Sequence, residues 1–325
     1  MRSWLAVIAG AMLAAGASAQ ATASAATTGP AAAYLALQQR DQMLFRAGWR
    51  LTTGNAPFCA RTIPAIGALL LDTTTYPDPA AARAAFGLQG DIAVQAVATG
   101  SPAAHRQLPV GASLTRLNNR ELAADFPPAQ PAWKRLMAIT AALEQALQRD
   151  REVEVAWQEP DGAFAFARIG SVPACASRFE VTGIGDRAAA DGERVLFGDR
   201  FPGFDWPEEE FAAAVAHELA HNLLGHRAWL DRHGRSRSNI RRTEHEADRL
   251  APWLLANAGY DPAAAVRLMR RWGPEHGGGL FRKRTHAGWD ERADMMAAEL
   301  PQVERARANA DKADWSRYFR RDTGE

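Results

Sequence analysis

The sequence of 325 residues has few cysteines, little net charge and no long apolar run in its interior. Its two cysteines allow a single disulfide and exclude a scaffold held together by many. The 38 basic residues nearly balance the 37 acidic ones, so the chain has no general attraction for nucleic acid or for an anionic membrane. We therefore expect no nucleic-acid partner.

The only segment with the character of an export signal is at the start of the chain, in residues 1–19. It carries one positive charge at Arg2, an apolar run from Trp4 to Ala15, and the small-x-small triplet of residues 17–19. The run is too short for a comfortable membrane span, and no other stretch reaches spanning length. We expect a cleaved signal peptide, a disordered lead-in over residues 20–33, and an exported protein, periplasmic or secreted, with no transmembrane anchor.

The two cysteines, Cys59 and Cys175, are expected to form a disulfide. In an exported protein two cysteines more often pair than stay free. They bracket a distinct segment of the chain, so the bridge is expected to clamp the neck of an inserted module.

The richest chemistry of the sequence lies in the five residues His217-Glu218-Leu219-Ala220-His221. Apolar residues recur at every fourth position through this region, which predicts a helix. Asp205 with Glu208 has the spacing of a capping box, and Pro207 is expected in the first turn of that helix.

On a helix, His217 and His221 lie one turn apart and can direct two imidazoles at one metal ion. Zinc suits nitrogen ligands, and a catalytic zinc site keeps one position for a water that Glu218 could deprotonate as general base. Two histidines and a glutamate beside an apolar helix face also need polar partners, which a metal supplies. The motif predicts one Zn²⁺ per chain and hydrolysis of peptide bonds.

The third metal ligand is expected in Glu244-His245-Glu246-Ala247-Asp248. Glu244 and Asp248 are four residues apart and share a helix face, so one can bind the metal while the other hydrogen-bonds a ligand imidazole. On spacing alone, Glu246 and His245 remain alternative ligands.

HELAH followed by EHEAD resembles the HtpX-like and CAAX-prenyl-protease family of zinc metallopeptidases, whose motifs are HExxH and ExxxD. The resemblance implies that Glu244 is the third ligand and that Asp248 hydrogen-bonds a ligand histidine. It also implies that the strand expected at residues 194–197, just before the HExxH helix, is the sheet edge on which an extended substrate lies.

A further stretch, Thr285-His286 with Arg292, resembles the family's Thr-His-Pro sequence followed by an arginine, with Ala287 in place of the proline. The resemblance implies that His286 approaches the metal. It could take the open metal position and inhibit, or donate a hydrogen bond to the oxyanion and act as a catalytic residue.

Other features of this half of the chain carry simpler expectations. Pro252 should bend or shorten the second metal-binding helix, which could shift Glu244. The basic run at residues 235–242 is interpreted as a solvated loop. The remaining histidines have no acidic or histidine partner at ligand spacing in a recognisable motif, and they are expected to be structural or solvated: His105, His226, His233 and His276.

The segment between the cysteines resembles bacterial PDZ domains over roughly residues 82–169. A strand at residues 91–98 leads through Gly-Ser-Pro-Ala-Ala to a second strand, then to a helix at 131–148 and a last strand at 152–157. The peptide-carboxylate loop would fall at residues 86–90. The match departs from the usual pattern at two positions: Ala112 replaces the usual Asp, and Asn119 replaces the usual Gly. The resemblance implies that an extended peptide could bind at a strand edge.

Together these features predict an α+β protein: a mainly helical zincin-type metallopeptidase domain with a small sheet, and an inserted PDZ-like β-rich domain. Residues 34–80 would form the first part of the peptidase domain, 82–170 the insertion and 171–325 the main part with the zinc site. The expected function is a zinc endopeptidase acting on unfolded or misassembled exported polypeptides. The alternative is a metal-stabilised chaperone or adaptor that binds peptides without cutting them.

Overall fold

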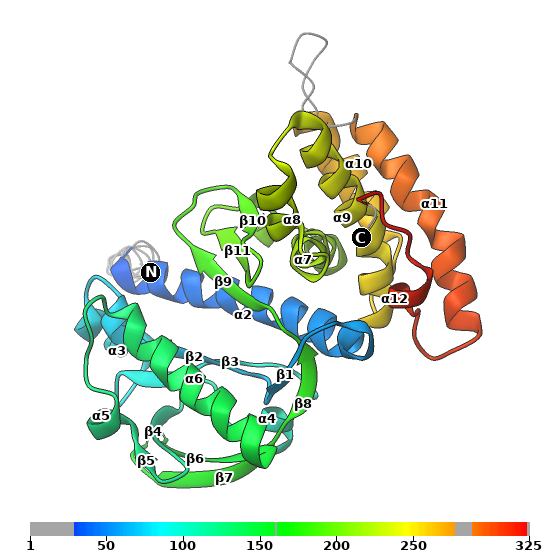
Figure 1. Ribbon diagram of the computed structural model, residues 1–325. Coiled ribbons are helices and arrows are strands. Elements are labelled where there is room, and N and C mark those ends of the chain that lie inside the picture. The colour runs from blue at the N-terminus through cyan, green and yellow to red at the C-terminus, as the bar shows by residue number, and fades with distance from the viewer. Residues whose placement is uncertain (1–28, 160, 277–287, 324–325) are drawn as a thin grey trace, which may run out of the picture.

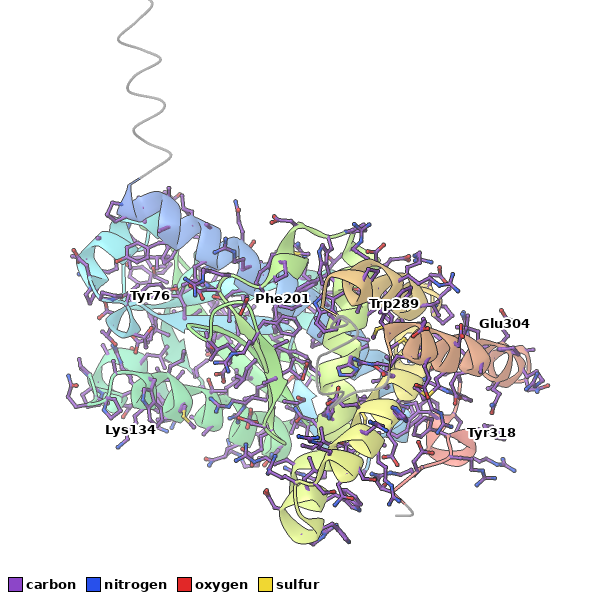
Figure 2. The ribbon with its side chains drawn as sticks, turned by 90° about the horizontal axis from the view of Figure 1, so that it is seen from above. Tyr76, Lys134, Phe201, Trp289, Glu304 and Tyr318 are labelled. Atoms are coloured by element: carbon purple, nitrogen blue, oxygen red, sulfur yellow. A yellow bond between two sulfur atoms is a disulfide. The ribbon has the colours of Figure 1, made fainter. Side chains whose placement is uncertain are left out.

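The computed structural model describes residues 29–159, 161–276 and 288–323, and its helices and mostly antiparallel sheets form an α+β fold with a sheet-rich region and a mainly helical region (Figure 1). The segment 1–19, expected to be a signal peptide, and His286 lie outside the described residues. Seen from above, Lys134 of the inserted sheet region and Glu304 of the helical region lie on far sides of the molecule (Figure 2).

Helix α2, Pro30–Asn55, runs between these two regions (Figure 1). Proline suits its first turn, where an N–H would have no partner. The helix therefore includes residues 30–33, which were expected to be disordered. Its buried face packs on the helical core, and at Gly48 the backbone comes so close to the next sheet that an added Cβ would lie 2.5 Å from the Phe179 ring.

The inserted region is a six-stranded antiparallel sheet in the order β2-β3-β4-β6-β7, with short β5 beside β4. Helix α6, Trp133–Asp150, packs its apolar residues on this sheet. The strands are β2 Ala68–Asp72, β3 Ile92–Val97, β4 Ser113–Leu117, β5 Arg120–Glu121, β6 Glu152–Gln158 and β7 Phe164–Gly170. The short helices are η2 Thr73–Thr75, α3 Pro79–Phe86, α4 Pro102–His105 and α5 Leu122–Asp125.

Strand β2 covers the edge of β3 beside the loop that was expected to bind a peptide carboxylate, residues 86–90. The two strands pair antiparallel from Ala68↔Val97 to Asp72↔Ile92, and Leu71 packs on Leu88 of that loop. A peptide could therefore lie along this edge of β3 only if β2 moved away. The domain boundary predicted at residue 82 leaves this strand out of the sheet to which it belongs.

The neck of the inserted region is a two-stranded ribbon closed by the predicted disulfide. Strand β1, Thr62–Ala65, follows the short helix η1, Ala56–Phe58, and pairs antiparallel with β8, Val172–Cys175. Cys59 and Cys175 are bonded, with their Cα atoms 5.6 Å apart and a sequence separation of 116. The expected clamp on the neck is confirmed.

Replacing both cysteines with alanine should lower the free energy of unfolding by about 4–5 kcal/mol, because the bridge closes a loop of 116 residues and so restricts the unfolded chain. Urea unfolding of the two proteins measures the difference. Intact mass without reduction should show two hydrogens fewer than the reduced chain. An unchanged unfolding midpoint, or two alkylated thiols in protein taken from the exporting cell, would contradict the clamp.

The small sheet of the helical region has three strands in the order β10-β11-β9. They are β9 Arg178–Thr182, β10 Ala188–Ala190 and β11 Arg194–Gly198. Strand β11 pairs with both neighbours, antiparallel to β10 and parallel to β9. The strand before the HExxH helix is therefore central, and the expectation that residues 194–197 form the sheet edge is wrong.

The helical region surrounds a core of large buried side chains that includes Phe197, Phe211 and Trp253. Its helices are η3 Pro202–Asp205, α7 Glu208–Leu223, α8 His226–His233, α9 Arg237–Asn257, α10 Ala264–His276, α11 Trp289–Ala308 and α12 Trp315–Tyr318. Buried Asn55 and Asn257 hydrogen-bond at 2.9 Å and join the ends of α2 and α9. Across the described ranges, no helix combines the length and apolarity needed to cross a bilayer.

Candidate metal centre

Helix α7 carries the HELAH motif, as predicted, with its apolar stripe buried in the core. The capping box is wrong: Pro207 is the residue before the first turn, no side chain caps that end, and Asp205 closes the preceding 3₁₀ helix. Glutamates in the first turn instead complement the positive end of the helix dipole. His217, Glu218 and His221 are half-buried at the border of the stripe.

Helix α9 carries the second motif and begins earlier than expected. The Ser236 hydroxyl accepts a hydrogen bond from the Asn239 amide and caps the helix, so the basic run interpreted as a loop is mostly its exposed first turns. The helix continues through Pro252 to Asn257, so the expected shortening does not occur. Pro252 removes a hydrogen bond to the Asp248 carbonyl, whereas Glu244 lies two turns before the proline.

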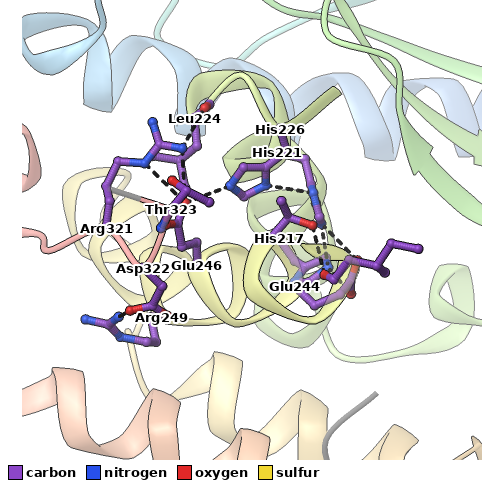
Figure 3. Close-up of polar contacts among 12 residues, drawn as sticks. His217, His221, Leu224, His226, Glu244, Glu246, Arg249, Arg321, Asp322 and Thr323 are labelled. Carbon is purple, nitrogen blue, oxygen red and sulfur yellow. Dashed lines mark hydrogen bonds and ion pairs between the residues drawn. The ribbon is translucent and has the colours of Figure 1, made fainter. Parts of the chain in front are cut away.

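The two helices bring three ligand atoms to one point. His217 Nε2 and His221 Nε2 are 3.3 Å apart, and each lies 3.6 Å from a different carboxylate oxygen of Glu244 (Figure 3). Donor atoms on a tetrahedral zinc with bonds of 2.0–2.1 Å are about 3.3–3.4 Å apart. Among the described residues, these three side chains form the group whose donor atoms could hold a metal ion. The spacing of these donor atoms therefore matches that of ligands around one small metal ion such as zinc.

The outward nitrogen of His217 is held by Asp248 from α9. His217 Nδ1 lies 3.0 Å from Asp248 Oδ1, and Arg292 of α11 donates two hydrogen bonds to the same carboxylate, at 2.6 and 2.7 Å. Asp248 is fully buried, and the guanidinium compensates its charge. This arrangement leaves His217 Nε2 facing the other two candidate ligands. The resemblance implied that Asp248 hydrogen-bonds a ligand histidine, and Asp248 makes such a contact with His217.

The outward nitrogen of His221 is held differently, by a residue whose role the sequence did not reveal. His226 Nδ1 lies 2.9 Å from His221 Nδ1, and its Nε2 lies 3.0 Å from Glu246 Oε2. His226 is buried, as a structural residue would be, but it contacts a candidate ligand directly. Gly225, at φ 65°, turns the chain between α7 and α8 and brings His226 back toward His221.

Of the two alternatives that spacing left open, Glu246 points away from the three ligand atoms. Its carboxylate is fully buried and accepts hydrogen bonds from His226, Arg321 and the Thr323 amide. His245 does not belong to the group that could hold a metal. The arrangement brings Glu244, and neither alternative, to the two imidazoles.

The site concentrates negative charge. Burial alone would raise the pKa of Glu244, but its hydrogen bond with His217 and the nearby His221 and Arg292 hold that pKa well below its usual range. Burial also opposes protonation of His217, yet Asp248 and Glu244 raise its pKa to about 10. The carboxylates thus favour a positive charge between the imidazoles, which a metal cation supplies in place of a proton.

Burial shifts the pKa values of Glu218 and His221 in opposite directions. Burial raises the pKa of Glu218 to about 7, opposed by His217 and reinforced by Glu244. A carboxyl group of that pKa can accept and return a proton near neutral pH. Burial lowers the pKa of His221 to about 3, so its imidazole is neutral, the form that binds metals.

A comparison of the chain with protein-family models, with curated proteins and with solved structures finds no match. His286 cannot be placed relative to the site, since it lies outside the described residues.

The protein purified with zinc should hold about one equivalent per chain, and Glu244→Ala should weaken binding beyond the roughly 10–100-fold expected for losing only a hydrogen-bond partner of a ligand. Metal analysis and competition with a chromophoric chelator measure both quantities. Asp231→Asn, which removes an exposed carboxylate on α8, is the control. Unchanged zinc affinity in Glu244→Ala would show that another residue is the third ligand.

Proposed function

We propose that this protein is a zinc-dependent endopeptidase that cleaves extended or unfolded polypeptides outside the cytoplasm. The observation that supports this most strongly is the convergence of His217 Nε2, His221 Nε2 and the Glu244 carboxylate at tetrahedral spacing, with Glu218 in the same turn of α7. A structural zinc site would be closed by a fourth protein ligand, whereas this donor set has three members among the described residues.

Each residue of the site has a distinct role in the proposed hydrolysis. Zinc, when bound by His217, His221 and Glu244, supplies Lewis acidity toward the scissile carbonyl and the attacking water. Glu218 accepts the proton of that water and returns it to the leaving amine, for which its raised pKa is suited. Asp248, braced by Arg292, keeps the His217 ring oriented with its Nε2 toward the metal position.

An extended substrate has a strand edge available near the catalytic helix. Strand β10 is the outer strand of the small sheet and packs beside α7 (Figure 1). Its residues are three alanines, Ala188–Ala190, whose small side chains leave the backbone accessible. Pairing through main-chain hydrogen bonds accepts many sequences, which suits a protease for unfolded chains. We assign to β10 the substrate role that the sequence had suggested for residues 194–197.

Export is supported by the disulfide, because such bonds persist in oxidising compartments. The substrates are accordingly proposed to be exported polypeptides. Whether His286 inhibits or assists is a separate question for the variant His286→Ala, which should raise activity in the first case and lower it in the second.

Glu218→Gln should keep zinc and lose nearly all turnover, because the amide cannot accept a proton while its size and the three ligands are unchanged. Casein digestion, followed with and without a chelator, measures activity, and metal analysis confirms loading. Glu208→Gln, at the exposed start of the same helix, is the matched control and should digest casein at the normal rate. Normal digestion by Glu218→Gln would contradict the proposed mechanism.

A second candidate function, a peptide-binding chaperone or adaptor, is favoured by one observation. A cleft of about 1160 Å³ separates the inserted sheet from the helical region and is lined by the outer strand β2, by Trp133 and Met137 of α6, and by Phe179 of β9. Both α6 side chains are about half exposed, so apolar surface is available to a client. The metal-site residues do not line this cleft. Client binding that is unaffected by Glu218→Gln, together with no chelator-sensitive cleavage, would favour this function.

A further inference from the structure

We propose that the short segment Arg321–Thr323 positions the metal ligand His221, acting through Glu246 and His226. The inference rests on the metal site of the proposed function and extends it to a segment 75 residues from Glu246 in sequence. The contacts form a continuous chain from Arg321 to the face of α7 (Figure 3).

The first step of the chain sets which nitrogen of His221 is free. For His221 to present Nε2 to a metal, its hydrogen must be on Nδ1, which then donates to His226 Nδ1 at 2.9 Å. His226 must in turn carry its own hydrogen on Nε2, and it donates that hydrogen to Glu246 Oε2 at 3.0 Å. Because the Glu246 carboxylate also accepts from Arg321 and the Thr323 amide, it serves as the acceptor at the end of the chain and determines the tautomers of both rings.

The second step is the set of donors that holds the Glu246 carboxylate in place. Arg321 Nε and Nη2 each lie 3.1 Å from Glu246 Oε2, and the Thr323 amide donates to Oε1 at 2.6 Å. Arg321 Nη2 also donates to the carbonyl of Leu224, at the end of α7, at 3.0 Å. One guanidinium therefore joins the buried carboxylate of α9 to the helix that carries His221.

The third step is the attachment of the segment itself. Asp322 accepts a hydrogen bond from Arg249 of α9 at 3.0 Å, and Phe319 lies under the same guanidinium. Residues 319–323 are not helical. The segment is thus held by side-chain contacts and has no helical backbone hydrogen bonds of its own.

The contacts that hold His221 come from a different kind of segment than the contacts that hold His217. His217 is held by Asp248 and Arg292, both of which belong to long helices. His221 depends, through two intermediates, on an irregular segment of a few residues. Release of Arg321 and Thr323 would remove three hydrogen bonds from the buried Glu246 carboxylate without unfolding a helix. His226 would then lose its fixed acceptor and His221 its fixed orientation.

The test measures metal affinity, so it does not depend on turnover. Arg321→Ala should weaken zinc binding by about 10–100-fold, the range for losing an outer partner of a ligand, measured by competition with a chromophoric chelator. Arg320→Ala is the matched control, since it removes an exposed arginine from the neighbouring position and should leave affinity unchanged. Thr323→Pro removes the amide donor to Glu246, keeps Arg321 and should weaken binding in the same direction, which keeps the test valid if Arg321→Ala folds poorly.

A double-mutant cycle separates this chain of contacts from a general loss of stability. His226→Phe removes the middle of the chain, and if Arg321 acts through His226 the double variant should bind zinc no more weakly than the weaker single variant. Fully additive effects, or normal affinity in both Arg321→Ala and Thr323→Pro, would overturn the proposal. So would a wild-type protein that binds no zinc. If Glu218→Gln digests casein normally while Arg321→Ala weakens zinc binding, the catalytic mechanism is overturned and this inference stands.

Discussion

Three acidic side chains on one stretch of α9 impose the constraint on which the rest of the site depends. Glu246 and Asp248 are fully buried and Glu244 is partly buried. A buried carboxylate without a partner costs several kcal/mol, so each must have compensating groups nearby. Asp248 has Arg292 of α11, Glu246 has Arg321 of the segment after α12, and Glu244 has the two imidazoles of α7.

These partners come from segments far apart in the chain, and satisfying them arranges the helices around α9. Helices α7 and α11 both pack along it, and the contacts to Asp248 and Glu246 hold the two imidazoles by their outer nitrogens. Both inner nitrogens are thereby left facing Glu244. The geometry that suits a metal is thus a consequence of how the charges of α9 are compensated.

The inserted sheet is joined to this arrangement by α2 and by the disulfide-closed neck, and its residues do not enter the metal site. Its resemblance to a PDZ domain remains a prediction. Because β2 pairs with the edge of β3, a strand of the chain itself occupies the place where a peptide was expected to bind. The open surfaces nearby are those of the cleft beside β2 and α6.

Sequence reasoning succeeded where the signal was local. Four-residue periodicity placed His217 and His221 on one helix, and the family resemblance selected Glu244 from a cluster that spacing left ambiguous. It failed where geometry depends on distant pairing or on a turn. Nothing local shows that β11 pairs on both sides, that Arg321 reaches Glu246, or that Gly225 returns His226 to His221. The α9 start was missed because the Ser236 cap lies in a charged stretch without apolar periodicity.

The central claim is that two imidazoles and one carboxylate hold a zinc ion and leave a position open. X-ray absorption at the zinc edge of the loaded protein tests it most directly, because the spectrum reports the number and type of neighbouring atoms. We expect about four light neighbours near 2.0–2.1 Å, of which two show the outer-atom scattering of imidazole rings. Three or more imidazoles around a closed site that persist in His286→Ala, or six oxygen neighbours at longer distance with no imidazole, would contradict this claim.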